Sequence, residues 1–422
     1  CGGGANGGDV EALIRASMAL RGVRPSIDEV EAVAGGAPLE PIARRWLSEP
    51  TFGATIRDLH AEQLLVRFDV RNHVKSVGPL RGVPEGDLVR RLDEEPLAFV
   101  EQVVAQGRPY TEIVTADTTM ADRTVAAAYG LPYDDAGPEW QELPWSDGRP
   151  AAGILSSSTV WQRFMSSTTN HHRSRANLVR SILLCDPFVG GSVVSDPTAL
   201  DALADDPACG ACHSELDPLS SAFFGFRDYV LPGDNVAATQ AGCPPELAWA
   251  CYPLKMWDPA GTVSRDDANM PPAALGDVPL DDVGDLGLAI AADPRFATCT
   301  ARRFAGYLTQ RPIEDVPDDE ADRLADLLID AGWDARELAL AVVLDPAFLD
   351  GGPQQARPEQ VARTFEALTG WRWEVEPEPG YGEVDLALTD RYGYRSILGG
   401  LDGWNTIRPV HQPTATRELT LA

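Results

Sequence analysis

Apolar residues recur at three- and four-residue intervals along much of the chain, which is the spacing of one helix face. In residues 41–66, for example, Ile42 and Trp46 stand four positions apart. The same pattern continues in residues 86–107, 174–188, 281–311 and 318–349. Alternating strand patterns are scarce, and long connections rich in Pro and Gly occur at residues 131–150 and 227–275. The pattern therefore predicts a mainly α fold with long loops.

Helix ends are marked by capping residues. Ser26 with Glu29 three residues later forms a capping-box pattern, and a glycine pair ends this helix. From residue 351 the pattern changes to a linker, one helix within 357–370 and an extended C-terminal tail. The expected segments are a tether at 1–10, an N-terminal helical domain at 11–150, a second helical domain at 151–350, and the linker, helix and tail at 351–422.

Charge and apolar content exclude several classes of partner. The chain has 64 acidic and 35 basic residues, and its formal net charge of -29 repels the phosphates of nucleic acids. No run of about 18 uninterrupted apolar residues occurs, so we expect any link to a membrane to be an anchor. The sequence also lacks a phosphate-binding loop and the glycine pattern of dinucleotide-binding proteins.

The first residues, CGGGANGGDVEAL, suggest such an anchor. They resemble the start of a mature bacterial lipoprotein, in which the cysteine carries the lipid and a flexible Gly-rich run tethers the folded body. This resemblance predicts lipidation of Cys1. No acidic residue follows directly, which favours an outer-membrane lipoprotein that is periplasmic or on the cell surface. The alternative is a chain that happens to begin at a cysteine.

The number of cysteines agrees with export to an oxidising compartment. The seven cysteines are Cys1, Cys185, Cys209, Cys212, Cys243, Cys251 and Cys299. If the first is lipidated and the CxxC pair acts together, four remain for two disulfides. Cys243 and Cys251 bracket the short segment CPPELAWAC and form the natural local pair. Elimination then pairs Cys185 with Cys299, although spacing alone does not determine connectivity.

Cys209, Cys212 and His213 form the motif C-x-x-C-H within CGACHSELDPLSSAFFGF. This is the attachment motif of a c-type haem, in which both thiols become thioethers and the histidine ligates the iron on its proximal side. Three alternatives stay open: a disulfide between the two cysteines, half of a zinc site, and a redox dithiol. A zinc site needs a second ligand cluster, which the sequence lacks. A redox dithiol needs a βαβ setting, which the helical surroundings do not predict.

The stretch CGACHSELDPLSSAFFGFRDY also resembles the CxxCH-x-x-x-DPLG segment of planctomycete- and myxobacterial-type cytochrome c proteins, an exported family with domains of unknown function. The segments PYTEIVTADTTMADRTVAAAYGLP, AAGILSSSTVWQRFMSSTTNHHRSRANLVRSILLC and LGLAIAADPRFATCTARRFAGYLTQRP resemble further parts of this family, and together they span about residues 95–350. The resemblance implies one covalent haem c in a mostly helical protein. Leu216 and Ser220 depart from the pattern, which has methionine and glycine there.

The sixth iron position decides between electron transfer and ligand chemistry, because a Met thioether closes the site whereas an open position admits small ligands. Met270 in NMPPAAL is the first candidate, since its Met-Pro step resembles the distal segments of small cytochromes c. It equally suits a methionine that fills a gap in a core. Further candidates are Met256, Met165, Met120, His171 and His172. The two histidines better suit a position at a helix start.

These features predict a lipid-anchored, exported c-type haem protein that carries single electrons, with the haem in the 151–350 domain. One CxxCH in 422 residues is a low haem density. This density favours a subunit of a larger surface or periplasmic assembly, as a homo- or hetero-oligomer with a redox partner protein. Two alternatives stay open: a peroxidase-like haem enzyme with an open distal site, and a surface lipoprotein whose haem is structural.

Overall fold

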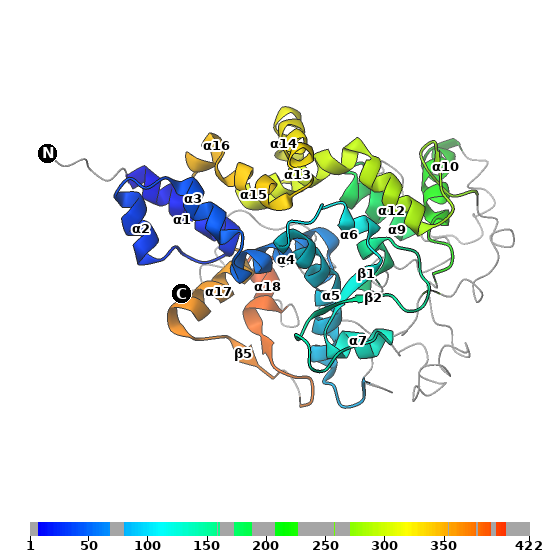
Figure 1. Ribbon diagram of the computed structural model, residues 1–422, viewed down its shortest axis with the longest axis horizontal. Coiled ribbons are helices and arrows are strands. Elements are labelled where there is room, and N and C mark those ends of the chain that lie inside the picture. Colours follow the sequence, from blue (N-terminus) through cyan, green and yellow to red (C-terminus); the bar gives the residue numbers. More distant parts are fainter. Residues whose placement is uncertain are drawn as a thin grey trace. The chain divides into compact units, whose positions relative to one another are not determined.

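The computed structural model in Figure 1 describes residues 7–67, 80–157, 159–160, 173–187, 207–226, 257, 271–352, 354–376, 379–389 and 394–401. Helices account for 60% of the structure and strands for 6%, which confirms the predicted mainly α class. Within these ranges no helix is both long enough and apolar enough to cross a membrane.

The chain forms two compact units that are discontinuous in sequence. The first unit consists of residues 1–71, 84–110 and 300–422, and the second of residues 72–83 and 111–299. The linear pattern led us to expect consecutive segments, whereas the contacts group both ends of the chain. Arg15, for example, donates to the carbonyl of Phe348 at 2.9 Å.

The first unit is built from helices and one small hairpin. Its elements are α1 (Gly7–Arg21), α2 (Ile27–Ala34), α3 (Leu39–Trp46), α4 (Pro50–Leu64), α5 (Glu85–Ala105), the larger part of α13 (Pro294–Thr309), η6 (Ile313–Asp315), α14 (Asp318–Asp330), α15 (Ala335–Val343), α16 (Pro346–Leu349), α17 (Pro358–Thr369), β5 (Glu374–Val375), β6 (Val384–Asp385), η7 (Leu386–Leu388) and α18 (Tyr394–Ile397). β5 and β6 pair antiparallel, with Val375 opposite Val384.

Local sequence signals set the helix ends of this unit. The capping box predicted for α2 is confirmed, since Ser26 Oγ accepts from the N–H of Glu29 and the Glu29 carboxylate accepts from the N–H of Ser26. The periodic stretch of residues 41–66 forms two helices, α3 and α4, because the chain turns before Pro50, which occupies the first turn of α4.

The core of the first unit lies between α4 and α5. Phe52, Ile56 and Leu59 follow helical spacing on α4 and are each at most 2% exposed. Phe99 and Val100 of α5 are equally buried. Burying each large apolar side chain stabilises the fold by about 1.5 to 3 kcal/mol, so this contact is a main source of stability.

A cluster of ion pairs lies beside this core. Arg67 contacts Asp58 of α4 at 2.7 Å and Glu94 of α5 at 2.6 Å. Arg57 adds a second contact to Glu94, at 3.3 Å. Burial raises the pKa of the Glu94 carboxyl, but the two arginines outweigh burial and hold that pKa below its ordinary value. Glu94 is therefore charged and holds α4 to α5.

The second unit contains shorter elements. They are α6 (Glu112–Thr115), β1 (Thr118–Ala121), α7 (Arg123–Tyr129), β2 (Gln141–Pro144), η2 (Gly153–Ser156), α9 (Arg173–Leu178), η3 (Val179–Leu183), α10 (Pro207–Ser221), β3 (Ala274–Leu275), β4 (Val278–Pro279), α12 (Val283–Ala292) and the start of α13. β1 and β2 pair antiparallel from Thr118 opposite Pro144 to Ala121 opposite Gln141. β3 and β4 form a second small hairpin.

Two kinds of residue shape the second unit locally. Asp122 caps α7 and Asp282 caps α12, each by accepting backbone N–H groups of the first turn. Gly153 has a φ of 50° and lies so close to the α6 backbone that a Cβ would come within 2.0 Å of the Ile113 carbonyl oxygen. Only glycine allows this approach, which packs η2 against α6.

His60 is a buried structural histidine of the first unit. Its Nδ1 lies 2.7 Å from the Ile56 carbonyl and its Nε2 lies 2.7 Å from the Tyr110 hydroxyl. Because a carbonyl only accepts, Nδ1 carries the proton and the Tyr110 hydroxyl donates to Nε2. The ring of Phe304 covers the pair edge-on. Burial lowers the pKa of His60 to about 4, so the ring is neutral at pH 7.

The stability of the protein should therefore fall in mild acid partly through His60. Its pKa rises to about 6.5 on unfolding, so the unfolded chain binds the extra proton between about pH 6.5 and 4. Protonation of His60 in the unfolded chain therefore lowers the free energy of unfolding by about 2 kcal/mol as the pH falls from 7 to 4.5. Urea unfolding of His60→Gln should show a correspondingly shallower pH dependence. The same slope in both proteins would contradict the assignment.

Candidate functional site

The CxxCH motif lies on α10, which is one continuous helix from Pro207 to Ser221. Cys209, Cys212 and His213 occupy positions i, i+3 and i+4 of this helix. Such positions share one helix face. Two thiols and one imidazole that serve a single macrocycle need this arrangement, so the backbone of α10 fits a c-type haem.

Asp217 holds the imidazole of His213. The Nδ1 atom of His213 lies 3.1 Å from Oδ1 and 3.2 Å from Oδ2 of Asp217, which stands one turn further along α10. A carboxylate only accepts hydrogen bonds, so in the neutral ring Nδ1 carries the proton and Nε2 keeps its lone pair. Metal-ligating histidines are commonly oriented by a carboxylate on their other nitrogen. The pair therefore fits His213 as an iron ligand through Nε2.

Two buried serines stabilise the backbone of Asp217. The hydroxyls of Ser220 and Ser221 donate to the Asp217 carbonyl at 2.8 and 3.1 Å, and neither serine has exposed surface. They lie in the turn that contains Pro218, where the proline ring removes one backbone donor. Ser220 is a departure from the family pattern, and in this chain its hydroxyl supports the residue that orients His213.

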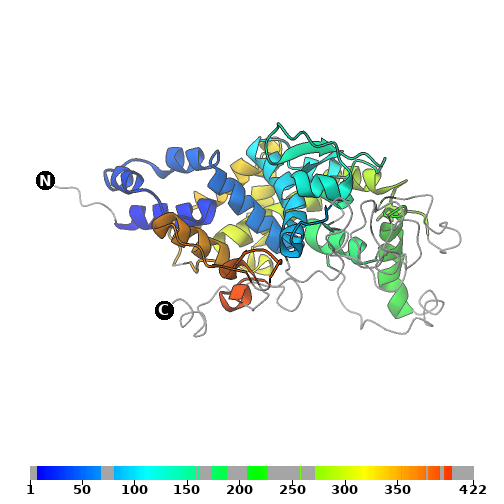
Figure 2. The same ribbon diagram turned by 90° about the horizontal axis from the view of Figure 1, so that it is seen from below.

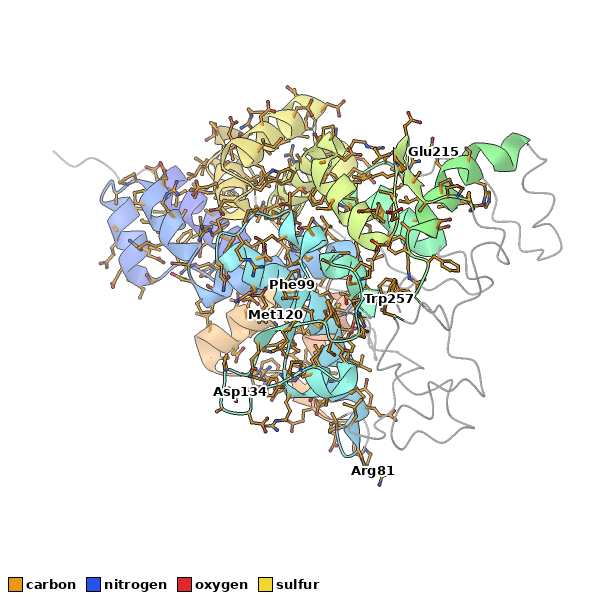
Figure 3. The ribbon with its side chains drawn as sticks, turned by 45° about the vertical axis from the view of Figure 1, so that its right-hand side comes forward. Arg81, Phe99, Met120, Asp134, Glu215 and Trp257 are labelled. Atoms are coloured by element: carbon orange, nitrogen blue, oxygen red, sulfur yellow. A yellow bond between two sulfur atoms is a disulfide. The ribbon has the colours of Figure 1, made fainter. Side chains whose placement is uncertain are left out.

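Arg180 connects α10 to its neighbours in the second unit. Its guanidinium pairs with Glu215 of α10, which Figure 3 labels. Its Nη2 also lies 2.5 Å from the carboxylate of Asp186, and Arg295 of α13 lies 2.8 Å from the same carboxylate. The Arg180 side chain is only 14% exposed. A charge so far removed from water depends on its partners, so the cluster helps to fix α10 in place.

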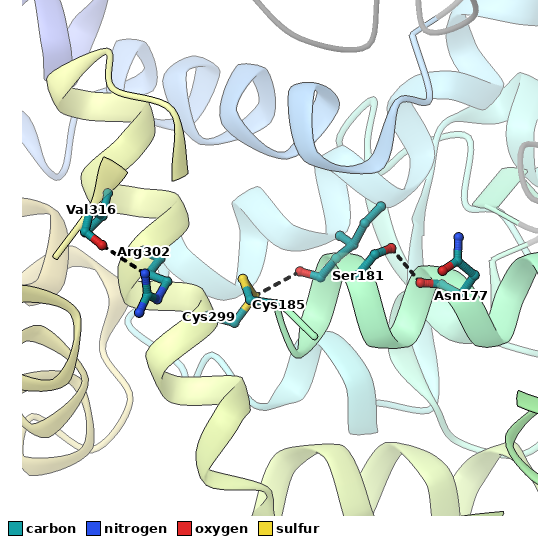
Figure 4. Close-up of a disulfide and its surroundings, with 7 residues drawn as sticks. Asn177, Ser181, Cys185, Cys299, Arg302 and Val316 are labelled. Carbon is teal, nitrogen blue, oxygen red and sulfur yellow. Dashed lines mark hydrogen bonds between the residues drawn. A yellow bond between two sulfur atoms is a disulfide. The ribbon is translucent and has the colours of Figure 1, made fainter. Parts of the chain in front are cut away.

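Cys185 and Cys299 form a disulfide, with 2.10 Å between the sulfur atoms and 5.2 Å between the Cα atoms (Figure 4). This is the pairing that elimination predicted from the sequence. It joins the chain just after η3 to α13, directly beside Asp186. Cys243 and Cys251, the other predicted pair, and the predicted lipid site Cys1 lie outside the described residues.

An aromatic contact closes the C-terminal end of α10. Phe223 and Phe226 are each 1% exposed, and the ring centroids of Phe226 and Trp257 are 4.9 Å apart. Figure 3 labels Trp257. Gly225, which directly precedes Phe226, has a φ of 110°, and a Cβ there would come within 2.5 Å of the Trp257 ring. Glycine is therefore required where the chain leaves the helix.

Most candidates for the sixth iron position lie outside the described residues. They are Met270, Met256, Met165, His171 and His172. Met120 is described: it lies on β1, is 6% exposed and stands opposite Glu142 in the hairpin. Over the described ranges, no group of three or more His, Cys, Asp or Glu side chains is arranged to hold a metal ion.

Two residues of the site were not among the sequence candidates. Asp217 has a signal in the sequence, since it stands four positions after His213 within a helix. Arg180 has none, because Glu215 is 35 residues away along the chain and only the fold brings the two together.

No protein-family model, curated protein or solved structure matches this chain. The resemblance to cytochrome c proteins therefore stays an expectation from the sequence. The assignment of a function depends on the residues of α10 themselves. These are two cysteines and a histidine on one helix face, with the imidazole proton held on Nδ1.

Removal of the disulfide should destabilise the second unit. Cys185 and Cys299 are 114 residues apart. A cross-link over this span lowers the conformational entropy of the unfolded chain, which in the loop-closure description raises the free energy of unfolding by about 5 kcal/mol. We expect the double variant Cys185→Ser, Cys299→Ser to lose roughly 2 to 5 kcal/mol in urea unfolding. Each single variant should show a similar loss. Stability equal to that of the unchanged protein would contradict a structural role for the bond.

Proposed function

We propose that this protein is an exported c-type haem protein that carries single electrons. The observation that supports this most is the CxxCH motif on one face of α10, with the Nδ1 proton of His213 held by Asp217. Cys209 and Cys212 would hold the haem as thioethers, and His213 would ligate its iron through Nε2.

A bound haem would supply one-electron chemistry through its iron. The residues of the chain act around it. Asp217 keeps the proton on Nδ1 and orients the ring of His213. Arg180 holds α10 through Glu215, and the buried Phe223 excludes water from the end of the helix.

The proposed setting is outside the cytoplasm. The Cys185–Cys299 disulfide suits an oxidising compartment. One haem motif in 422 residues favours a subunit whose partner protein supplies the next redox centre.

The His213–Asp217 pair also favours one alternative, a peroxidase-like enzyme with an open sixth position. A carboxylate on Nδ1 makes Nε2 a more basic ligand. A haem iron held by such a basic Nε2 would have a lower reduction potential, which favours the binding of small ligands over high-potential electron transfer. The sixth ligand decides between the two, and Met270 is our candidate for it.

Absorption spectra of the native protein, produced with a signal peptide in a host that attaches haem c, test the proposal. We expect one c-type haem per chain in a pyridine haemochrome assay, and retention of the haem after denaturation. The double variant Cys209→Ala, Cys212→Ala should lose covalent haem because no thioether can form. Native protein without haem would overturn the proposal and leave these cysteines as a dithiol or disulfide.

The same spectra separate the two candidate functions. An electron carrier closed by Met270 should show the weak Met–iron charge-transfer band, which Met270→Leu should abolish. Met120→Leu, a matched change on β1, should leave the band unchanged. A high-spin spectrum and carbon monoxide binding in the unchanged protein would instead favour the peroxidase-like enzyme.

The role of Asp217 can be measured separately. Asp217→Asn keeps a side-chain acceptor near Nδ1 but removes the charge, so the reduction potential should rise by roughly 40 mV, equivalent to about 1 kcal/mol. Glu215→Gln is the matched control, because it removes one charge from the same helix at a residue that pairs with Arg180.

A second measurement needs no haem. Nitrogen-15 NMR of the haem-free protein should show the imidazole of His213 protonated on Nδ1, and Asp217→Leu should shift the ring toward the other tautomer. Equal potentials in Asp217→Asn and Glu215→Gln, or an Nε2-protonated ring in the unchanged protein, would contradict the role of Asp217.

A further inference from the structure

A short turn connects the disulfide to the CxxCH helix of the second unit. The turn runs from Arg180 of η3 to Asp186 and includes Cys185. Arg180 pairs with Glu215 of α10, the helix that Figure 2 shows in bright green. Glu215 stands two positions after His213, so the turn contacts α10 beside the CxxCH motif. All of these residues belong to the second unit.

Arg180 and Asp186 close the turn through three contacts. The Asp186 N–H donates to the Arg180 carbonyl at 2.8 Å, and Arg180 Nε donates to the Asp186 carbonyl at 3.1 Å. The Arg180 guanidinium also pairs with the Asp186 carboxylate. A change in the backbone at residue 185 therefore moves the groups that hold the Arg180 side chain.

Cys185 has a left-handed backbone conformation. Its φ is 50°, which is uncommon for residues other than glycine because the Cβ comes too close to the following carbonyl oxygen. Cys185 follows Leu184, the C-cap of η3, and glycine is the usual residue at this position after a helix. The conformation costs free energy, so it persists only because neighbouring contacts hold it.

Two links hold the turn against α13. Cys299 and Arg295 stand four positions apart on α13 and so share one helix face. Cys185 is bonded to Cys299, and the adjacent Asp186 pairs with Arg295 at 2.8 Å. The Arg295 side chain is 45% exposed, and an ion pair so close to water is weak. The disulfide is therefore the stronger link, and it acts on the left-handed residue itself.

The structure also contains a partner for the opened bond. Sγ of Cys299 lies 3.3 Å from the Ile182 carbonyl, and a thiol in this position can donate to it. Cys185 is half-buried whereas Cys299 is 1% exposed, so we expect a reductant to attack Cys185. The buried thiol that leaves then has an acceptor in place.

A dithiol is the class of reductant that opens such a bond. One thiolate of the dithiol attacks Sγ of Cys185, and Cys299 leaves as a thiolate that takes up a proton. The second thiol of the reductant then displaces Cys185, which is protonated in turn, and the reductant ends as a disulfide. Two electrons thus pass from the dithiol to the cysteine pair. The proposed haem attachment needs the same class of reagent, because thioethers form from free thiols.

We propose that the Cys185–Cys299 disulfide is a redox switch that sets the position of α10. When it is closed, Cys185 stays left-handed and the turn presents Arg180 to Glu215. When it is open, Cys185 relaxes, Asp186 shifts and α10 is held less tightly. The consequence for the iron site rests on the proposed haem function, whereas the consequence for α10 does not.

Two variants without the bond test the mechanism. Both carry Cys299→Ser, and they differ in carrying Cys185→Ala or Cys185→Gly. Glycine adopts the left-handed conformation at little cost, so the turn should keep its shape, whereas alanine should relax. Hydrogen exchange of the full-length protein should therefore show the α10 amides exchanging about 10-fold faster in the alanine variant than in the glycine variant. Amides of α14 in the first unit should not differ. Loss of the cross-link by itself would affect both variants alike.

The role of Asp186 is tested with the disulfide intact. Asp186→Asn should speed exchange of the α10 amides several-fold, since it removes the carboxylate that holds Arg180. Asp293→Asn is the matched control, because Asp293 pairs with Arg295 at 2.7 Å rather than with Arg180. It should leave the exchange of α10 unchanged.

The switch also requires that the bond can open in the folded protein. Dithiothreitol without urea should make Cys185 and Cys299 available to a thiol label, which mass spectrometry locates. In haem-loaded protein the alanine variant should then differ from the glycine variant in the reduction potential of the iron. By linkage, the redox state of the iron would change the disulfide equilibrium by the same factor.

Three results would overturn the proposal. They are equal exchange of α10 in the alanine and glycine variants, equal exchange in Asp186→Asn and Asp293→Asn, and a bond that dithiothreitol opens only in urea. Native protein without haem would instead overturn the proposed function. It would leave these three measurements valid, because each reads the backbone of α10 or the two cysteines and needs no haem.

Discussion

Ion pairs between largely buried arginine and carboxylate side chains connect the helices of the first unit. The position of α17 depends on them. Asp58 is 6% exposed. It accepts a hydrogen bond from Arg67 at 2.7 Å and forms an ion pair with Arg363 of α17 at 2.6 Å. Arg357 at the start of α17 contacts Glu62 of α4 at 3.2 Å. Loss of one partner from such a pair leaves a buried charge, which typically costs about 3 to 5 kcal/mol. These pairs place α17, and with it an apolar groove of about 800 Å³ between α1 and α17.

The second unit uses the same interaction at the CxxCH helix. Arg180 lies between Glu215 of α10 and Asp186, and Asp186 also holds Arg295. The disulfide at Cys185 stands next to this cluster. A covalent bond and an ion-pair cluster therefore restrain the same short stretch of chain. The helix that carries His213 is held from outside, while Asp217 sets the orientation of the imidazole from within the helix.

Local features of the sequence predicted much of the fold. The capping box at Ser26, the helix from Pro358 and the mainly α class follow from neighbouring residues alone, because capping and helical periodicity act within a few positions. The division of residues 41–66 into two helices depends on a local turn that precedes Pro50. Periodicity alone could not show it, because the apolar spacing continues across the turn.

The sequence by itself determined the helical class and the CxxCH motif. Counting cysteines favoured the Cys185–Cys299 pair, which the structure then showed. Each depends on residue identity and short-range spacing. Only the tertiary structure decided that both ends of the chain share one unit, that Arg180 meets Glu215, and that α1 and α17 enclose a groove. The partners in these contacts stand tens to hundreds of residues apart. Contacts at such separations depend on how whole helices pack, and no local pattern in the sequence records which faces will meet.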